Sequence, residues 1–197
     1  MGRRISPRQK NPLIVICSEG NKKSAEVAYF KNFRNRNLRI EFVDGEETDP
    51  KGMLDKCLRY LKKIDFENED EAYCYLVLDT DLNKDRINMI KEIESICYEN
   101  NIKIITSAPT FEIWFLLHKR NNNITFANSK EVKKATKKEF NGYSEGINIY
   151  NEIKDYTTNA INNAKNLEKN SLGDKYEINP HSNIYEIIEV ILSKIKW

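Results

Sequence analysis

Three acidic side chains come directly after apolar segments that have the character of buried strands. Glu19 follows residues 12–17, and Asp79 and Asp81 follow residues 72–78. Carboxylate oxygens suit Mg²⁺, which commonly takes one or two carboxylates and completes its shell with water and substrate phosphate. Two such ions about 4 Å apart can stabilise both the attacking and the leaving oxygen of a phosphodiester. We interpret these residues as candidate metal ligands and catalytic groups for phosphoryl chemistry, with Mg²⁺ or Mn²⁺ as the metal.

The elements that must position these carboxylates alternate between strand and helix. Continuous apolar or alternating runs predict strands at residues 12–17, 38–43, 72–78 and 102–106, separated by segments with apolar side chains at helical spacing at 24–36, 50–63 and about 84–99. This alternation predicts an α/β fold with a mostly parallel sheet of about four strands and right-handed crossovers. All carboxyl ends of its strands then share one edge, where open α/β sheets place their sites.

The pattern becomes helical after residue 110. Apolar periodicity predicts helices over residues 111–117, 129–140, 145 or 146 to about 169, and 182–197, with Thr110 as the cap of the first. No Pro/Gly-rich linker divides them from the sheet. We therefore expect a single domain over residues 1–197, with an α/β core at 11–110 and a helical C-terminal half at 111–197 packed on it.

Composition narrows the classes of protein that this chain could belong to. It has 197 residues, 40% of them hydrophobic, and no apolar run near the roughly 20 residues that cross a bilayer. We expect a cytoplasmic protein without membrane contact. The four separated cysteines are expected to be reduced and buried, and two histidines are too few for a multi-histidine metal centre.

Net charge is only +2, but basic residues cluster at the N-terminus and at residues 130–138. Such runs suit phosphate binding, although the Lys-rich composition of the chain explains them equally well. A small chain of nearly neutral charge also leaves room for a homo-oligomer or for another subunit that extends its binding surface.

Four segments together resemble one family. LIVICSEGNKKSAEVAYFKNF, CYLVLDTD, SAPTFEIWFLLH and NPHSNIYEIIEVI are similar to the RloB-like proteins, which are related to an abortive-infection component and found at restriction and phage-defence loci. The resemblance runs from Leu13 to Leu192. It implies a sheet like the Toprim domain of topoisomerases, primases and overcoming-lysogenization-defect nucleases.

The resemblance also implies roles for individual residues. Glu19 becomes the general acid/base, Asp79 and Asp81 become Mg²⁺ ligands, and Glu26 matches a second, supporting acid of the family. Glu112, in a Pro-x-Phe-Glu-x-Trp stretch that ends at His118, is a further candidate catalytic carboxylate or, alternatively, a helix N-terminal acid. Lys22, Lys23 and His118 are weaker candidates for nucleic-acid binding, and a hydrogen-bonded core position is the other reading of His118.

These observations predict a Mg²⁺-dependent nuclease that cleaves DNA or RNA in anti-phage defence. One alternative is a phosphohydrolase with Asp79 as nucleophile, although such enzymes usually carry their DxD on the first strand. Another is a non-enzymatic defence adaptor or sensor. Because there is no GxxxxGK[ST] motif, any dependence on ATP would require an ATPase or other defence-system partner subunit.

Overall fold

A computed structural model of the chain describes residues 10–19, 24–43, 48–120, 124–144, 146–171 and 173–195. Its centre is a five-stranded sheet in the order β2-β1-β3-β4-β5. The first four strands are parallel, and the short β5 pairs antiparallel with β4. The strands are β1 (Leu13–Ser18), β2 (Arg39–Val43), β3 (Ala72–Asp79), β4 (Ile102–Ala108) and β5 (His181–Ser182).

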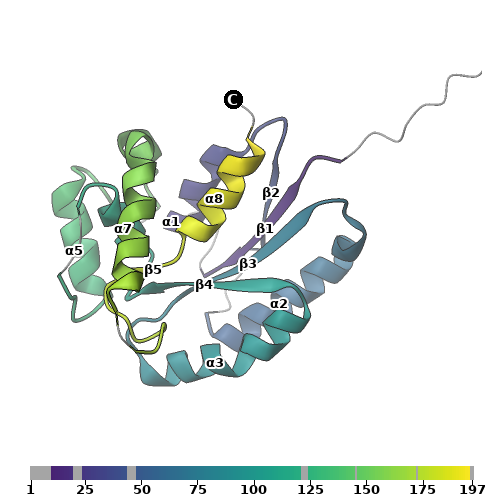
Figure 1. Ribbon diagram of the computed structural model, residues 1–197, viewed down its shortest axis with the longest axis horizontal. Coiled ribbons are helices and arrows are strands. Elements are labelled where there is room, and N and C mark those ends of the chain that lie inside the picture. Colours follow the sequence, from purple (N-terminus) through teal and green to yellow (C-terminus); the bar gives the residue numbers. More distant parts are fainter. Residues whose placement is uncertain are drawn as a thin grey trace, which may run out of the picture.

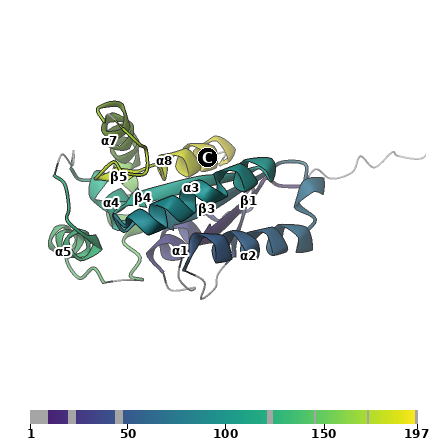
Figure 2. The same cartoon turned by 90° about the horizontal axis from the view of Figure 1, so that it is seen from below.

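Helices cover both faces of this sheet (Figure 1). Figure 2 shows α2 and α3 side by side along one face. The remaining helices lie on the other face or at the carboxyl end of the strands. The helices are α1 (Ala25–Phe30), α2 (Pro50–Lys63), α3 (Lys84–Glu99), α4 (Glu112–Leu117), α5 (Ser129–Glu139), α6 (Tyr150–Ile153), α7 (Thr157–Lys169) and α8 (Tyr185–Lys194), with 3-10 turns at Lys31–Phe33, Phe66–Asn68 and Lys154–Tyr156.

The alternation of side chains along β1 explains the two layers. Ile14 and Ile16 pack into a core with the C-terminal helices, while Leu13 and Val15 pack with α2 and α3 on the opposite face. Because both faces are covered, the strand is apolar at every position from Leu13 to Cys17, as expected for a parallel sheet. The predicted α/β class with a mostly parallel, helix-flanked sheet is confirmed.

Side-chain caps fix where the helices that flank the site begin. Asp49 accepts a hydrogen bond from Gly52 N at the start of α2, Asn83 accepts from Arg86 N at the start of α3, and Asn128 accepts from Glu131 N at the start of α5. Each cap satisfies an amide that the first helical turn leaves without a partner. The positions of α3 and α5 are therefore set close to the ends of the strands.

Four elements differ from the sequence-based expectations. The helix expected over 24–36 is a shorter α1 followed by a 3-10 turn, and the helix expected up to 169 is divided into α6, a 3-10 turn and α7. The fifth strand was not predicted, because a two-residue strand carries no periodicity. It is held to β4 through the Ser107–Ser182 register, with the two hydroxyl oxygens 3.0 Å apart. The helix expected to start at Ser182 begins only at Tyr185, because Ser182 belongs to this strand. The expected burial of the four cysteines is confirmed, and all four are free.

We expect Leu76→Ala to lower the free energy of unfolding by about 2–5 kcal/mol, because it removes a fully enclosed side chain from the central strand. Leu192→Ala is the matched control, since Leu192 is exposed and on α8, and its expected change is within about 0.5 kcal/mol. Urea unfolding of both variants measures the difference. Equal effects would contradict the placement of β3 at the centre of the core.

Candidate acidic site

The site forms where β1 and β3 end beside each other. Ser18 pairs with Val77 in parallel register, so the following residue, Glu19, reaches the end of β3. There its Oε1 accepts a hydrogen bond of 3.0 Å from the backbone N–H of Asp79. The prediction that Glu19 and the Asp79/Asp81 pair share the carboxyl edge therefore agrees with the structure.

The backbone turns sharply after Asp79. Thr80 N donates to Ser107 O and Asp81 N donates to Pro109 O, both at 2.9 Å, so the chain stays attached to the end of β4 while it leaves the sheet. Asp81 and Leu82 then take left-handed conformations with φ of 50° and 55°. Such conformations are uncommon outside glycine and cluster at functional sites. The turn places Asp79 and Asp81 in different surroundings.

Asp79 lies among other carboxylates. Thr110 Oγ1 is 2.7 Å from Asp79 Oδ2 and 2.8 Å from Glu112 Oε2. A hydroxyl has one hydrogen, so Thr110 can donate to only one of these two carboxyl groups at a time. Burial, followed by the negative charges of Glu26 and Glu112, raises the pKa of Asp79 well above its usual value. These surroundings therefore favour the protonated form of Asp79.

Glu112 and Glu26 are enclosed acids supplied by helices. Glu112 is the first residue of α4 and is 2% exposed, and its Oε1 accepts a hydrogen bond of 3.0 Å from the hydroxyl of Tyr143. Glu26 is in the first turn of α1 and is also buried. Both positions favour negative charge at a helix N-terminus. The helix-terminal role of Glu112 and its place in the acidic site are thus compatible.

Arg86 is the cation of this edge. Its guanidinium forms an ion pair with Glu19 and donates to the carbonyl oxygens of Asp79 and of Thr48, the latter at 2.7 Å. Its Nε is also 4.0 Å from Asp81 Oδ2. The helix α3 begins at Lys84, only two residues after Leu82, so its first turn brings Arg86 back over the strand ends. Arg86 holds Glu19 in an inward, charge-neutralised position.

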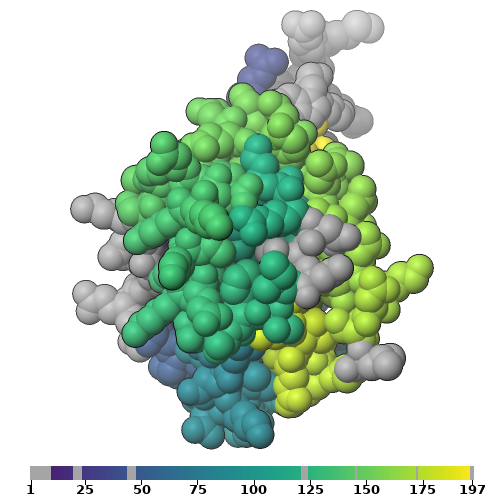
Figure 3. Space-filling model, turned by 90° about the vertical axis from the view of Figure 1, so that its left-hand side faces the viewer, coloured from purple at the N-terminus to yellow at the C-terminus, as the bar shows by residue number. Residues whose placement is uncertain are grey.

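Asp81 is the more exposed aspartate and points toward α5. Its Oδ1 accepts a hydrogen bond of 2.6 Å from the hydroxyl of Ser129, the first residue of that helix. The acidic edge is therefore joined directly to the start of α5. Figure 3 shows the side of the molecule on which α5 (green) lies, with the blue-green residues around the start of α3 next to it.

The donors suit a divalent cation in their chemistry but not in their present arrangement. Within the described part of the chain, no three Asp, Glu, His or Cys side chains are arranged to hold a metal ion. All the acids are nevertheless oxygen donors, and Asp79 is desolvated beside other negative charges. A divalent cation would neutralise this excess if it displaced the proton of Asp79 and if Glu19 left Arg86. The carboxylates concerned are Glu19, Glu26, Asp79, Asp81 and Glu112.

Other predicted site residues lie elsewhere. His118 is 1% exposed in the aromatic core, where its Nδ1 is 2.9 Å from Trp114 O, and burial lowers its pKa to about 4. The prediction that it contacts nucleic acid is therefore wrong for this structure, and its alternative, a hydrogen-bonded core histidine, is observed. Lys22, Lys23 and the basic residues before Lys10 lie outside the described residues. Thr110 does not cap α4, because its hydroxyl is engaged by Asp79 and Glu112.

Sequence reasoning missed the groups that hold the acids in place. Arg86, Thr110, Ser129 and Tyr143 come from four separate segments. Only two of them carried a local signal: Thr110 is two residues before Glu112, and Arg86 is in the first helical turn after the DTD sequence. The other two depend on how the C-terminal half packs.

Fold and site together define an open α/β protein with an acidic edge around a half-buried aspartate. The sequence profile of the RloB-like protein family matches residues 14–191, and the chain belongs to that family. Searches of curated proteins and of solved structures found no match to it. In the parts of the chain that are described, no helix is long and apolar enough to cross a membrane.

Proposed function

We propose that this protein is a Mg²⁺-dependent nuclease of Toprim type that hydrolyses phosphodiester bonds of DNA or RNA in defence against phage. One observation carries the proposal: acids from β1, β3 and the starts of α1 and α4 converge on one strand edge around a desolvated Asp79. Membership of the RloB-like family supports it. The cellular setting and any partner subunit are part of the proposal.

The residues of the acidic edge would have separate roles in metal binding, proton transfer and positioning. Asp79 and Asp81, with Mn²⁺ as a substitute for Mg²⁺, would hold the cation, which supplies charge neutralisation for the phosphate and an activated water when bound. Glu19, once released from Arg86, is positioned to accept or donate the proton of the attacking water or leaving oxygen. Thr110 and Tyr143 keep Glu112 oriented toward Asp79.

A nucleophilic role for Asp79, as in the phosphohydrolase alternative, is less well supported. A carboxyl group whose pKa is raised favours its neutral form, whereas a nucleophile needs the negative charge of the carboxylate. The aspartate also follows the third strand of the chain rather than the first. Trapping a phosphate ester on Asp79 would reverse this preference.

Cleavage assays test the proposed activity. Labelled DNA, tRNA and other RNA are incubated with the pure protein in Mg²⁺, in Mn²⁺ and in EDTA. We expect metal-dependent cleavage, and we expect Glu19→Gln to reduce its rate on the order of 10²–10⁴-fold, the usual contribution of a general acid or base. Glu99→Gln is the matched control, because Glu99 is exposed at the end of α3 on the opposite edge of the sheet.

Metal-dependent cleavage that is unchanged in Glu19→Gln and Asp79→Asn would refute the assignment of the site. Calorimetry with Mg²⁺ gives a reading that does not depend on finding the substrate, since loss of binding in Asp79→Asn but not in Glu99→Gln locates the cation. If the wild-type protein neither binds metal nor cleaves, while Asp81→Ala still protects cells from phage, the adaptor alternative replaces the nuclease.

A further inference from the structure

A stripe of lysines runs along α5, the helix that contacts Asp81. With 3.6 residues per turn, the four lysines fall within roughly 100° of the helix circumference and extend over about 12 Å of its length. The opposite face of α5 is buried through Val132 and Thr136. The stripe therefore faces away from the core, and all four side chains are exposed; they are Lys130, Lys134, Lys137 and Lys138, called the α5 lysine stripe below.

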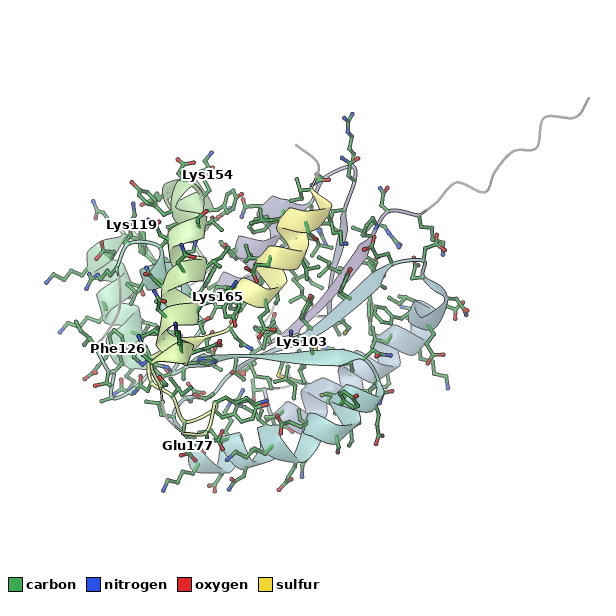
Figure 4. All side chains as sticks on the ribbon, in the orientation of Figure 1. Lys103, Lys119, Phe126, Lys154, Lys165 and Glu177 are labelled. Atoms are coloured by element: carbon green, nitrogen blue, oxygen red, sulfur yellow. The ribbon has the colours of Figure 1, made fainter. Side chains whose placement is uncertain are left out.

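The α5 lysine stripe has no acidic partner among the residues that the structure describes. Several lysines elsewhere form ion pairs, and Figure 4 labels two of them, Lys103 in β4 and Lys165 on α7. Nitrogen-tipped side chains project from α5 at the left of that view. The paired lysines elsewhere include Lys51, Lys91, Lys103, Lys165, Lys175 and Lys194, bonded to Glu92, Asp174, Glu186, Glu189, Glu94 and Glu71.

This arrangement costs the helix stability. Lys130, Lys134 and Lys138 are spaced four residues apart, and like charges at that spacing destabilise a helix by about 0.2–0.5 kcal/mol per pair. If these lysines contacted only solvent, no interaction would offset this repulsion. A polyanion that lies along the helix would convert the repulsion into attraction.

The position of the stripe identifies the polyanion. Lys130 follows Ser129, whose hydroxyl is bonded to Asp81 Oδ1 at 2.6 Å, so the stripe begins one residue from the acidic site and leads away from it. We propose that the α5 lysine stripe binds the phosphate backbone of the nucleic acid and directs one of its phosphodiesters to the Asp79/Asp81 edge. The proposal deepens the nuclease function and rests on it for the identity of the substrate.

Lysine contacts of this kind bind phosphates by charge and do not read sequence. Each phosphate that a lysine neutralises adds about 0.9 to the slope of log K against log salt for duplex DNA and about 0.7 for single strands. Loss of the stripe should therefore weaken binding for every sequence and flatten its salt dependence. This signature separates the proposed role from a loss of fold or of chemistry.

The test measures binding without metal. Fluorescence anisotropy in EDTA, over a series of KCl concentrations, follows labelled single-stranded RNA, single-stranded DNA and duplex DNA. We expect Lys130→Gln/Lys134→Gln/Lys137→Gln/Lys138→Gln to weaken binding at least about tenfold and to reduce the salt slope by about 2–4. The same four positions changed to Arg keep the charge and should retain both.

A charge-matched control removes four positive charges elsewhere. Arg59, Lys62 and Lys63 lie on α2 toward the opposite edge of the sheet, and Lys154 lies before α7, where Figure 4 shows it at the far end of that helix. All four are exposed. Their combined change to Gln should leave most of the salt slope in place, because net charge alone does not account for a localised contact.

The outcomes are distinct. Equal binding and slope in the stripe variant and the control variant would overturn the proposal, as would stronger binding of the wild-type protein to phosphatidylserine vesicles than to any of the three nucleic acids. Stripe-dependent binding together with absent cleavage would leave the stripe proposal standing and remove the nuclease function. If the stripe variant cleaved nucleic acid and bound it with wild-type affinity, the nuclease function would stand and the stripe proposal would be overturned.

Discussion

Asp79→Asn is expected to make the metal-free protein more stable. The substitution removes a desolvated charge beside Glu26 and Glu112, and leaving such a group uncompensated costs about 1–3 kcal/mol. For a chain of this size, that corresponds to a rise in Tm of about 2–10 °C in EDTA at mildly alkaline pH. Removing a proposed metal ligand would thus raise the stability of the fold. This is expected where active-site residues serve function at the expense of stability.

The stabilisation expected from Asp79→Asn depends on pH. The pKa of Asp79 is raised in the folded state, so the folded protein binds this proton more tightly than the unfolded chain does. Stability then falls as pH rises from the ordinary aspartate pKa through the raised one, by up to about 1.4 kcal/mol per pH unit. Below that window Asp79 is protonated in both states. The advantage of Asp79→Asn should therefore be absent in acid and should grow with pH.

Thermal unfolding followed by circular dichroism across this pH range measures the effect, with Glu99→Gln as the control. Saturating Mg²⁺ should raise the Tm of the wild-type protein but not of Asp79→Asn, because a ligand stabilises only the state that binds it. A lower Tm for Asp79→Asn at alkaline pH would show that the Asp79 carboxylate is compensated in a way that the structure does not contain.

Arg86→Gln is expected to have the opposite effect. It removes the cation paired with Glu19 and the hydrogen bonds that Arg86 donates to the carbonyl oxygens of Asp79 and Thr48. Removing one partner of a largely buried ion pair costs about 3–5 kcal/mol, which lowers Tm by about 6–20 °C at this chain length. Mg²⁺ should restore much of the loss and should bind more tightly than to the wild-type protein, because Glu19 no longer has to leave an arginine.

Neighbouring residues provide a control variant and a double-mutant cycle for Arg86→Gln. Lys84→Gln removes an exposed positive charge from the same helical turn and should change Tm little. Arg86→Lys keeps the charge but not the fork of donors, so its loss should be intermediate. In the double variant Glu19→Gln/Arg86→Gln the two effects should not add, and additive losses would show that the ion pair does not couple them.

The sheet and its acidic edge could be predicted because local sequence determines them. Runs such as residues 72–78 are apolar at consecutive positions, and parallel topology then fixes which edge Glu19 and Asp79 share. The actual directions of the two aspartates could not be predicted, because they depend on the left-handed turn at Asp81 and Leu82. Sequence spacing alone suggested that both would face one ion.

The surrounding side chains were harder to predict for a different reason. Thr110 fitted a helix cap, and its hydroxyl instead serves two carboxyl groups once β4 is placed beside β3. Tyr143 lies in a segment without clear periodicity and reaches Glu112 only through the packing of the C-terminal half. Similarly, the interruption before Thr157 has no proline or glycine at the break to announce it.

The acidic edge draws on residues far apart along the chain, from Glu19 in the first tenth to Tyr143 in the last third. During synthesis, the β1 and β3 carboxylates leave the ribosome well before the segments that contribute Ser129 and Tyr143. Contacts of such long range form late in folding, since the chain must close large loops first. A nascent or truncated chain therefore has the acids without their supports, and in the cell a finished acidic edge is a property of completed molecules.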